Sequence, residues 1–356
     1  MSRSGSSRRG FLGSSALSLG LVALPGHGRA ESGTVFANGV VVLSSGPAYG
    51  YIAGWAKLLA PYLLEALPRD VNSSFTAMGG PDGVTVGNAF GARMDPDGST
   101  IMFAPGAAML AWLEGDSRVK YDTAQWIPVL VGVVPAVLVG RRGLVLSPGR
   151  RNPLRIGATN PLGPELAALL ALDLMGVPAQ PVFGMGDPQS LSEGLRRRSI
   201  DLAFLSGPKI KNALAAAAAA GAVPLFSTGA QGCEGLATRD PLLPNVPSFV
   251  EAAATFAIEV PAKPGFAAYS AAAAAAATCF VAVLPDLVRA ETVATWRRGT
   301  QISLDSLSVA AVAVPQGVRF LSGGCAATFF MQMTVASGTL ATLRTTIQRR
   351  YGWHAS

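Results

Sequence analysis

The two histidines of this sequence, His27 and His354, are poorly placed for catalysis. His27 lies in an amino-terminal stretch that looks like a leader, and His354 is two residues from the carboxyl terminus. A catalytic triad or a histidine metal site needs an imidazole held by packed elements. The nucleophile pattern G-x-S-x-G and the phosphate pattern G-x-x-x-x-G-K-[ST] are absent. These observations favour binding over turnover, and we expect neither an enzyme nor a cofactor.

The three cysteines, Cys233, Cys279 and Cys325, are far apart and form no C-x-x-C metal motif. At most one disulfide can form. Three buried thiols are the alternative, which the usual burial of free cysteine favours.

Three loops contain glycine, and the first and third also carry hydroxyl or amide side chains: Ser44–Gly50, Ala104–Gly106 and Ala158–Pro164. Each is expected to follow a strand and precede a helix. Glycine lets a ligand approach the backbone, and the free N–H groups and partial positive charge of a helix N-terminus suit a carboxylate. An ordinary turn is the alternative for any one of them.

The loops contain no Lys, Arg or His, so an anion would be held by backbone N–H groups, hydroxyls and water. With one residue from a later strand end, the predicted ligand-binding residues are Ser45, Gly46, Pro47, Ala48, Tyr49, Ala104, Thr159, Asn160, Gly163 and Ser206. We expect no metal site.

Alternating strands and helices must position these loops. Expected strands are Gly39–Leu43, Val71–Thr76, Thr100–Ala104, Ile127–Val131, Ala136–Val139, Arg155–Ala158, Asp201–Leu205 and Val223–Ser227. Expected helices are Tyr51–Leu67, Val84–Ala92, Ala107–Leu113, Glu165–Met175, Ser190–Arg198, Ser248–Phe256, Ala271–Phe280, Leu287–Arg297 and Leu340–Tyr351. This alternation predicts an α/β fold of mostly parallel sheets flanked by helices, with ligand beyond the carboxyl ends of the strands.

Length and composition favour two lobes. The chain has 356 residues, of which 50% are hydrophobic and 14% charged. Of its net charge of +7, the first 30 residues supply four positive charges and no acid, which leaves +3. Basic residues do not alternate with aromatic ones, so we expect no nucleic-acid partner.

The amino terminus has the layout of an export signal. Arg8 and Arg9 directly precede a mildly apolar stretch, Phe11–Leu24, and small residues follow. The stretch is too short to span a bilayer. It resembles a twin-arginine signal over residues 1–30, cleaved near Ala30, and a disordered basic terminus is the alternative. We therefore expect a periplasmic protein.

A second apolar segment, Phe266–Leu284, carries no charge over 19 residues. Most of it is alanine, which forms helices but offers little apolar area. We expect a helix of a protein that is not embedded in the membrane, and a membrane span is the alternative.

Several short patterns occur together in one order. They are Gly91–Met102 around Pro96-Asp97-Gly98, Val119–Asp122 with Trp126–Val129, and Asp240–Ala252 around Leu243-Pro244-Asn245-Val246-Pro247. In this order they resemble the Bug-type, or TctC-like, extracytoplasmic solute receptors of tripartite tricarboxylate transporters, over about residues 40–256. The first loop departs from that family, because Gly50 and Gly54 stand where Asp and Arg are usual.

The resemblance implies a two-lobed, type II-like periplasmic-binding-protein architecture that closes on a small carboxylate. We expect residues 31–135 and 232–356 to form lobe 1, and residues 136–231 to form lobe 2. The implied partners are the ligand and the membrane subunits of a transporter, and we expect a monomer. An exported hydrolase, or an orphan binding protein that presents its ligand to a sensor, is the alternative function.

Overall fold

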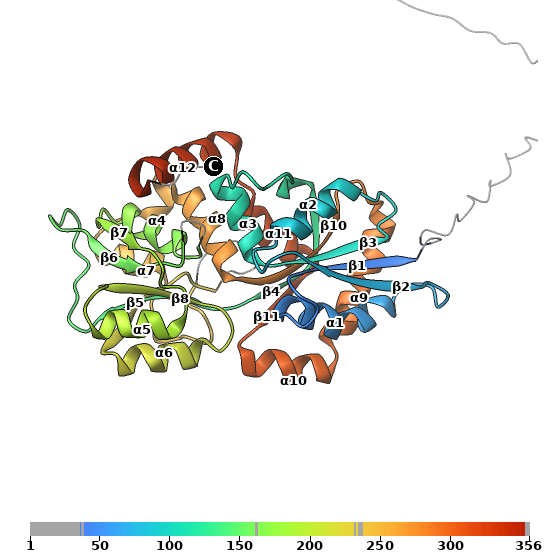
Figure 1. The fold of residues 1–356 in the computed structure, drawn as a ribbon, viewed down its shortest axis with the longest axis horizontal. Helices are drawn as coiled ribbons and strands as arrows, with labels where there is room; N and C mark the ends of the chain where they lie inside the picture. The colour runs from blue at the N-terminus through green and yellow to red at the C-terminus, as the bar shows by residue number, and fades with distance from the viewer. Residues whose placement is uncertain (1–35, 37–38, 161–162, 231–232, 234–237, 353–356) are drawn as a thin grey trace, which may run out of the picture. The chain divides into compact units, whose positions relative to one another are not determined.

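The computed structural model describes residues 36, 39–160, 163–230, 233 and 238–352. They belong to one compact unit, Val35–Ser356. The predicted signal segment lies outside the described residues. Figure 1 shows a mixed α/β fold with two sheets and helices packed on them.

Sheet A has six strands in the order β11-β4-β10-β3-β1-β2. They are β1 Val40–Ser45, β2 Ser73–Met78, β3 Thr100–Ala104, β4 Trp126–Val133, β10 Thr278–Pro285 and β11 Arg319–Ser322. Strand β1 runs parallel to β2 and β3, whereas β10 is antiparallel to β3 and β4, and β11 is antiparallel to β4.

Sheet B has five strands in the order β7-β6-β8-β5-β9. They are β5 Ala136–Arg141, β6 Leu154–Gly157, β7 Ala179–Val182, β8 Leu202–Ser206 and β9 Ala222–Ser227. Strand β6 is parallel to β7 and β8, and β5 is antiparallel to β8 and β9.

The predicted α/β fold with helices on its sheets is confirmed, but both sheets are mixed rather than mostly parallel. The departure arises where the chain crosses between the sheets. It passes directly from β4 in sheet A to β5 in sheet B, and these connecting strands have antiparallel neighbours.

Twelve α-helices connect the strands of the described part of the chain. They are α1 Tyr51–Leu64, α2 Val84–Arg93, α3 Gly106–Glu114, α4 Leu166–Leu174, α5 Pro188–Arg196, α6 Ile210–Ala219, α7 Phe249–Ala254, α8 Phe266–Ala277, α9 Ala290–Leu304, α10 Leu307–Gln316, α11 Gly323–Met333 and α12 Ser337–Tyr351. Most predicted elements are found with ends shifted by a few residues. The predicted division into two lobes stays a prediction.

The alanine-rich helix α8 is the centre of the core. Ala271–Ala277 are all buried, and α3, α4 and α11 pack against this helix. Since an alanine side chain is one methyl group, neighbouring backbones come close: a Cβ added to Gly106 of α3 would lie 2.0 Å from the Ala275 carbonyl oxygen. Within the described residues, no helix is both long and apolar enough to cross a membrane.

The predicted helix Ala271–Phe280 ends too late. Helix α8 stops at Ala277, and Thr278, Cys279 and Phe280 begin the buried strand β10. The Thr278 hydroxyl donates to the Ala274 carbonyl oxygen at 2.8 Å and so satisfies a carbonyl of the last helical turn. The branched and aromatic residues that follow favour a strand.

Two of the three cysteines are joined. Cys233, in the connection after β9, forms a disulfide with Cys325 at the start of α11, 92 residues later. Three buried thiols, the alternative that the sequence favoured, are therefore wrong. Cys279 is free and buried, and its thiol donates to the Tyr51 hydroxyl at 3.4 Å.

Candidate anion-binding site

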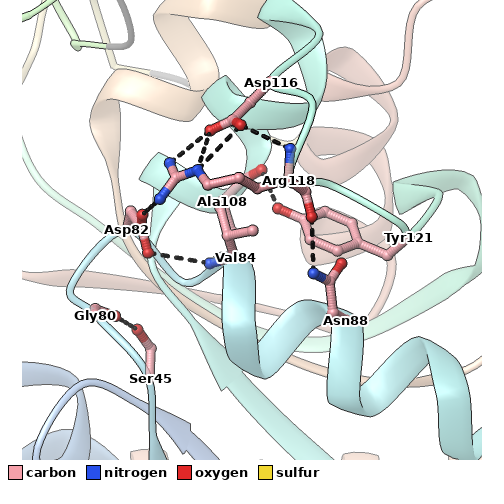
Figure 2. A network of polar contacts seen from close by, with 9 residues as sticks. All are labelled: Ser45, Gly80, Asp82, Val84, Asn88, Ala108, Asp116, Arg118 and Tyr121. Carbon is pink, nitrogen blue, oxygen red and sulfur yellow. Dashed lines mark hydrogen bonds and ion pairs between the residues drawn. The ribbon is translucent and has the colours of Figure 1, made fainter. Parts of the chain in front are cut away.

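The loops after β1, β2 and β3 contact one another through hydrogen bonds and close packing at the carboxyl edge of sheet A. The Ser45 hydroxyl donates to the Gly80 carbonyl at 2.9 Å (Figure 2). The Gly46 N–H donates to the Met78 carbonyl at 3.0 Å. Gly83 packs so closely on Pro105 that an added Cβ would lie 2.7 Å from its Cδ atom. The predicted residues Ser45, Gly46 and Ala104 therefore lie along one edge, together with the loop Gly79–Gly83, which the sequence prediction left out.

The charges at this edge are paired with one another. The Arg118 guanidinium forms ion pairs with Asp82 at 2.9 Å and with Asp116 at 2.5 Å (Figure 2). Hydrogen bonds from Arg118 hold the pKa of Asp116 below its usual value. Asp82 also accepts the Val84 N–H at 3.3 Å, at the start of α2. Two carboxylates thus neutralise Arg118, and its positive charge is not available for an anionic ligand.

The tip of the first loop projects into solvent. Pro47 and Ala48 are exposed, and the Tyr49 side chain is 93% exposed. Gly46 has a φ of +80°, and a Cβ placed on it would meet nothing within 4 Å. Gly46 itself is buried, but the space into which a side chain would point is open. Ala104 is fully buried at the end of β3.

At the carboxyl edge of sheet B, the loop after β6 encloses a buried acid. The Thr159 hydroxyl donates to Glu165 Oε1 at 3.4 Å, and Gly163 lies against Oε2 of the same carboxyl. Glu165 is 4% exposed, and burial raises its pKa to about 7. Thr159 is thus engaged with Glu165. Asn160 is exposed, and residues 161–162 lie outside the described part.

A second buried acid, Glu114, interacts electrostatically with Glu165. Glu114 ends α3 and is 1% exposed. Neither of its carboxyl oxygens has a hydrogen-bond partner in the described structure. Burial raises its pKa well above the usual value, and the charges of Glu165 and then Asp116 raise it further. This pair is not visible in the sequence, because only the fold brings α3 and α4 against the same helix, α8.

The connection between β8 and α6 carries cations. Ser206 is half-buried and ends β8, next to β6 in the sheet. Lys209 follows in a left-handed conformation with φ +58°, and its N–H donates to the Gln316 carbonyl at 3.0 Å. The Gln316 side chain accepts the Tyr51 hydroxyl at 2.9 Å. Gln316, at the end of α10, therefore contacts both the start of α1 and the start of α6.

A cavity of about 360 Å³ lies at this junction. Its lining comes mainly from the start of α6 and the end of α10 and consists of Lys209, Ile210, Lys211, Asn212, Leu242, Val314, Pro315, Gln316 and Gly317. Among the described residues, neither lysine has a carboxylate partner. Two ammonium groups beside a helix N-terminus can hold an anion.

None of the ten predicted ligand-binding residues lines this cavity. Ser206 is the nearest in sequence, three residues before Lys209. The available signal was the turn Gly207-Pro208-Lys209, a fourth connection between a strand and a helix, and the only one of the four with a lysine. In the described part of the chain, no group of three or more acidic, histidine or cysteine residues could hold a metal ion.

The chain is similar to solved structures at low identity. No family model matches it, and no curated protein matches it either. A TctC solute binding protein from Polaromonas, solved without ligand, is 14% identical with a TM-score of 0.62, and the match covers 87% of this chain and 98% of that one.

Two structures from Rhodopseudomonas palustris contain ligands. MatC with bound malate is 16% identical with a TM-score of 0.51, over 87% of this chain and 98% of that one. A protein with adipate is 18% identical with a TM-score of 0.52, over 88% and 97%. At these identities the likeness concerns architecture. The chain has the fold that the TctC solute binding protein of Polaromonas and these two proteins share.

Proposed function

We propose that this protein is an exported receptor that captures a small carboxylate and delivers it to a membrane transporter. The observation that carries the proposal is the cavity between α6 and α10, which is lined by two lysines without a carboxylate partner among the described residues. Gln316 connects it to the start of α1, directly after the predicted first loop. A carboxylate bound there would receive charge from Lys209 and Lys211 and would lie near loop backbones.

The similar structures support a carboxylate ligand. Two of the proteins that share the fold contain malate or adipate. In this chain, the ten predicted residues and the two lysines lie at or beside the carboxyl ends of strands, where α/β proteins bind ligands. A ligand held by residues that follow strands of both sheets would favour a closed form, because it would interact more strongly with that form than with an open one.

Export is supported by two separate observations. The Cys233–Cys325 disulfide suits an oxidising compartment. Arg8 and Arg9 precede the apolar stretch of the proposed signal. Replacing both with lysine should leave the precursor in the cytoplasm, measured by fractionation and immunoblotting. Normal export of that variant would contradict the twin-arginine route.

The first experiment identifies the ligand. The protein is purified from the periplasm, unfolded, and its released small molecules are identified by mass spectrometry. The identified carboxylate should then raise the melting temperature and stay chemically intact. At a hundredfold excess over Kd, binding should add about 2.7 kcal/mol to the free energy of unfolding. Conversion of the ligand to a product would support the hydrolase alternative instead.

The second experiment tests the lysines by calorimetry. The variant with Lys209→Ala and Lys211→Ala should bind the carboxylate more than about a hundredfold more weakly, because each charged hydrogen bond contributes about 1.5–3 kcal/mol and both are lost. Lys120→Ala is the control, because Lys120 is also exposed but lies outside the cavity. Unchanged affinity in the double variant would place the ligand elsewhere.

A further inference from the structure

Eight arginines gather at one edge of sheet B, and we call this surface the arginine edge. It is formed where β6, β7 and β8 begin and where the antiparallel strand β5 ends. Its members are Arg141, Arg142, Arg150, Arg151, Arg155, Arg196, Arg197 and Arg198. The carboxyl ends of β6 and β8 belong to the opposite edge of the same sheet. The lysine cavity lies there, at the start of α6 after β8.

Asp201 forms ion pairs with two of these arginines. Arg141 and Arg155 both form ion pairs with its carboxylate, and Arg155 also donates to the Arg198 carbonyl at 2.7 Å. These contacts bring the end of β5, the start of β6 and the end of α5 side by side. The hydrogen bonds of Arg155 and the charges of Arg155 and Arg141 lower the pKa of Asp201, although burial opposes them.

Backbone hydrogen bonds hold the connection between β5 and β6, residues 142–153, at the same edge of the sheet. The Arg142 N–H donates to the Gly221 carbonyl at 2.9 Å, just before β9. The Gly149 N–H donates to the Gly176 carbonyl at 2.8 Å, close to the start of β7. Arg150 and Arg151 follow directly, so both arginine pairs of this connection lie at the same edge.

The positive charge of the arginine edge is largely uncompensated. Its acids are Asp201 and Glu193, and Glu193 pairs with Arg196 and Arg197. The arginine edge therefore has eight guanidinium groups and only two carboxylates. Residues 123–164 contain no Asp or Glu at all. This local excess of six positive charges is larger than the +3 left for the chain after residue 30, so the other residues after residue 30 carry a formal net charge of −3.

An apolar side chain projects from the same surface. Val145 is 66% exposed and lies between the pair Arg141-Arg142 and the pair Arg150-Arg151, while the neighbouring Leu146 is buried and anchors the loop. Guanidinium groups match phosphate oxygens with two parallel hydrogen bonds. Basic residues around an exposed apolar one are typical of surfaces that lie on anionic bilayers.

We propose that the arginine edge docks the protein on an anionic phospholipid bilayer, with guanidinium groups on lipid phosphates and Val145 in the interface. The cavity at the opposite edge of the sheet stays accessible to ligand. This inference goes beyond the proposed receptor function and is independent of the identity of the carboxylate.

The test is cosedimentation of the full mature chain with vesicles. Vesicles that contain phosphatidylglycerol should bind the protein, and pure phosphatidylcholine vesicles should not. Raising the NaCl concentration should release it. The variant with Arg142→Ser, Arg150→Ser and Arg151→Ser should bind about a hundredfold more weakly, since each basic residue near an anionic surface contributes about fivefold.

The matched control removes the same charge elsewhere. The control variant carries Arg69→Ser, Arg289→Ser and Arg298→Ser, three exposed arginines outside the arginine edge, and should bind nearly as the unchanged protein does. Val145→Ser should weaken binding a few-fold at every NaCl concentration. Equal losses in the two triple variants would reduce the effect to net charge and overturn the proposal, and so would equal binding to both kinds of vesicle. Unfolding curves confirm that each variant is folded.

Discussion

The carboxyl edges of the two sheets have similar backbones but opposite charge arrangements. At sheet A, three loops after parallel strands are bound to one another, and Arg118 is held by Asp82 and Asp116. At sheet B, an acid is buried behind the loop after β6, while Lys209 and Lys211, at the start of α6 after β8, line a cavity.

The difference shows that loop position and charge supply separate parts of a site. Sheet A offers open space and backbone groups beside Gly46, but its cation is already neutralised. Sheet B offers two lysines that have no carboxylate partner among the described residues, although the Thr159 hydroxyl already donates to Glu165. The lysines and the open space beside Gly46 therefore belong to different edges, and a ligand that used both would contact residues of both sheets.

The largest expected effect comes from cutting the covalent link between the segment after β9 and helix α11. The variant with Cys233→Ser and Cys325→Ser should lose about 2–5 kcal/mol of unfolding free energy, because the disulfide joins cysteines 92 residues apart. Urea unfolding under non-reducing conditions measures this. Cys279→Ser serves as the control, since Cys279 is the free thiol. Equal unfolding midpoints for the double variant and the unchanged protein would mean that the two cysteines are not joined.

The buried acids should make stability depend on pH. The folded pKa of Glu165 is raised from 4.5 to about 7, so the folded state binds the proton more tightly than the unfolded state. Stability is therefore fully present below about pH 4.5, falls as pH rises towards 7, and has lost about 3 kcal/mol above it. Glu114 should act in the same direction.

Glu165→Gln should remove the share of this pH dependence that comes from Glu165 and leave the share of Glu114. The variant should be more stable than the unchanged protein at pH 8 and about equally stable at pH 4, measured by urea unfolding at both values. Glu193→Gln is the control: Glu193 lies on the surface, and arginine partners lower its pKa. A Glu165→Gln variant that lost stability at pH 8 would show that the carboxylate is stabilised by its surroundings.

Substitutions at two glycines, both with room for a side chain, test the backbone conformation of the first loop of sheet A. Gly46 has a φ of +80°, whereas Gly54 lies inside α1, and an added Cβ meets nothing within 4 Å at either position. Gly46→Ala should therefore cost about 1 kcal/mol through backbone strain alone. Gly54→Ala should instead stabilise by about 0.5–1 kcal/mol. Thermal unfolding of both variants checks the opposite signs, and stabilisation by Gly46→Ala would contradict the loop conformation.

The smallest effect is expected at Arg118. Because its charge is neutralised by two acids and its side chain is 57% exposed, Arg118→Gln should cost at most about 1 kcal/mol of stability. It should change carboxylate affinity by less than about twofold, in contrast to the lysine variants. A large loss of affinity in Arg118→Gln, measured by calorimetry, would show that Arg118 contributes to carboxylate binding. The two edges would then not differ in whether their cations are available.

Sequence patterns identified most of the first nine strands and most of the helices that follow them, because βα units leave local signals. Thr100–Ala104 was predicted with both ends correct, since Gly98 precedes its branched and apolar residues and Pro105 follows it. The short strand β7, Ala179–Val182, was missed because Pro181 hides its pattern. Helices α10 and α11 and strand β11 were missed because small residues there blur the apolar periodicity.

The candidate site could be predicted only in part for a different reason. The glycine-containing loops are visible in the sequence because turn residues mark them. Pairings over long sequence distances are not visible: Tyr51 and Gln316 are 265 residues apart. The same holds for Glu114 and Glu165, which come together only through packing on α8. Which charged residues lie near the candidate site could therefore be seen only in the fold.

Helix α8 raises a question of register during folding. Seven consecutive alanines, Ala271–Ala277, present nearly the same surface after any rotation of the helix or any shift by one residue along it. Their packing therefore fixes where the helix lies but not which residue faces which neighbour. The larger residues at its ends must select the correct alignment: Tyr269 packs on Phe249 with 4.4 Å between ring centroids, and Thr278 bonds back to Ala274. Deleting one alanine would preserve every contact type along the middle of the helix and misplace one of these two anchors.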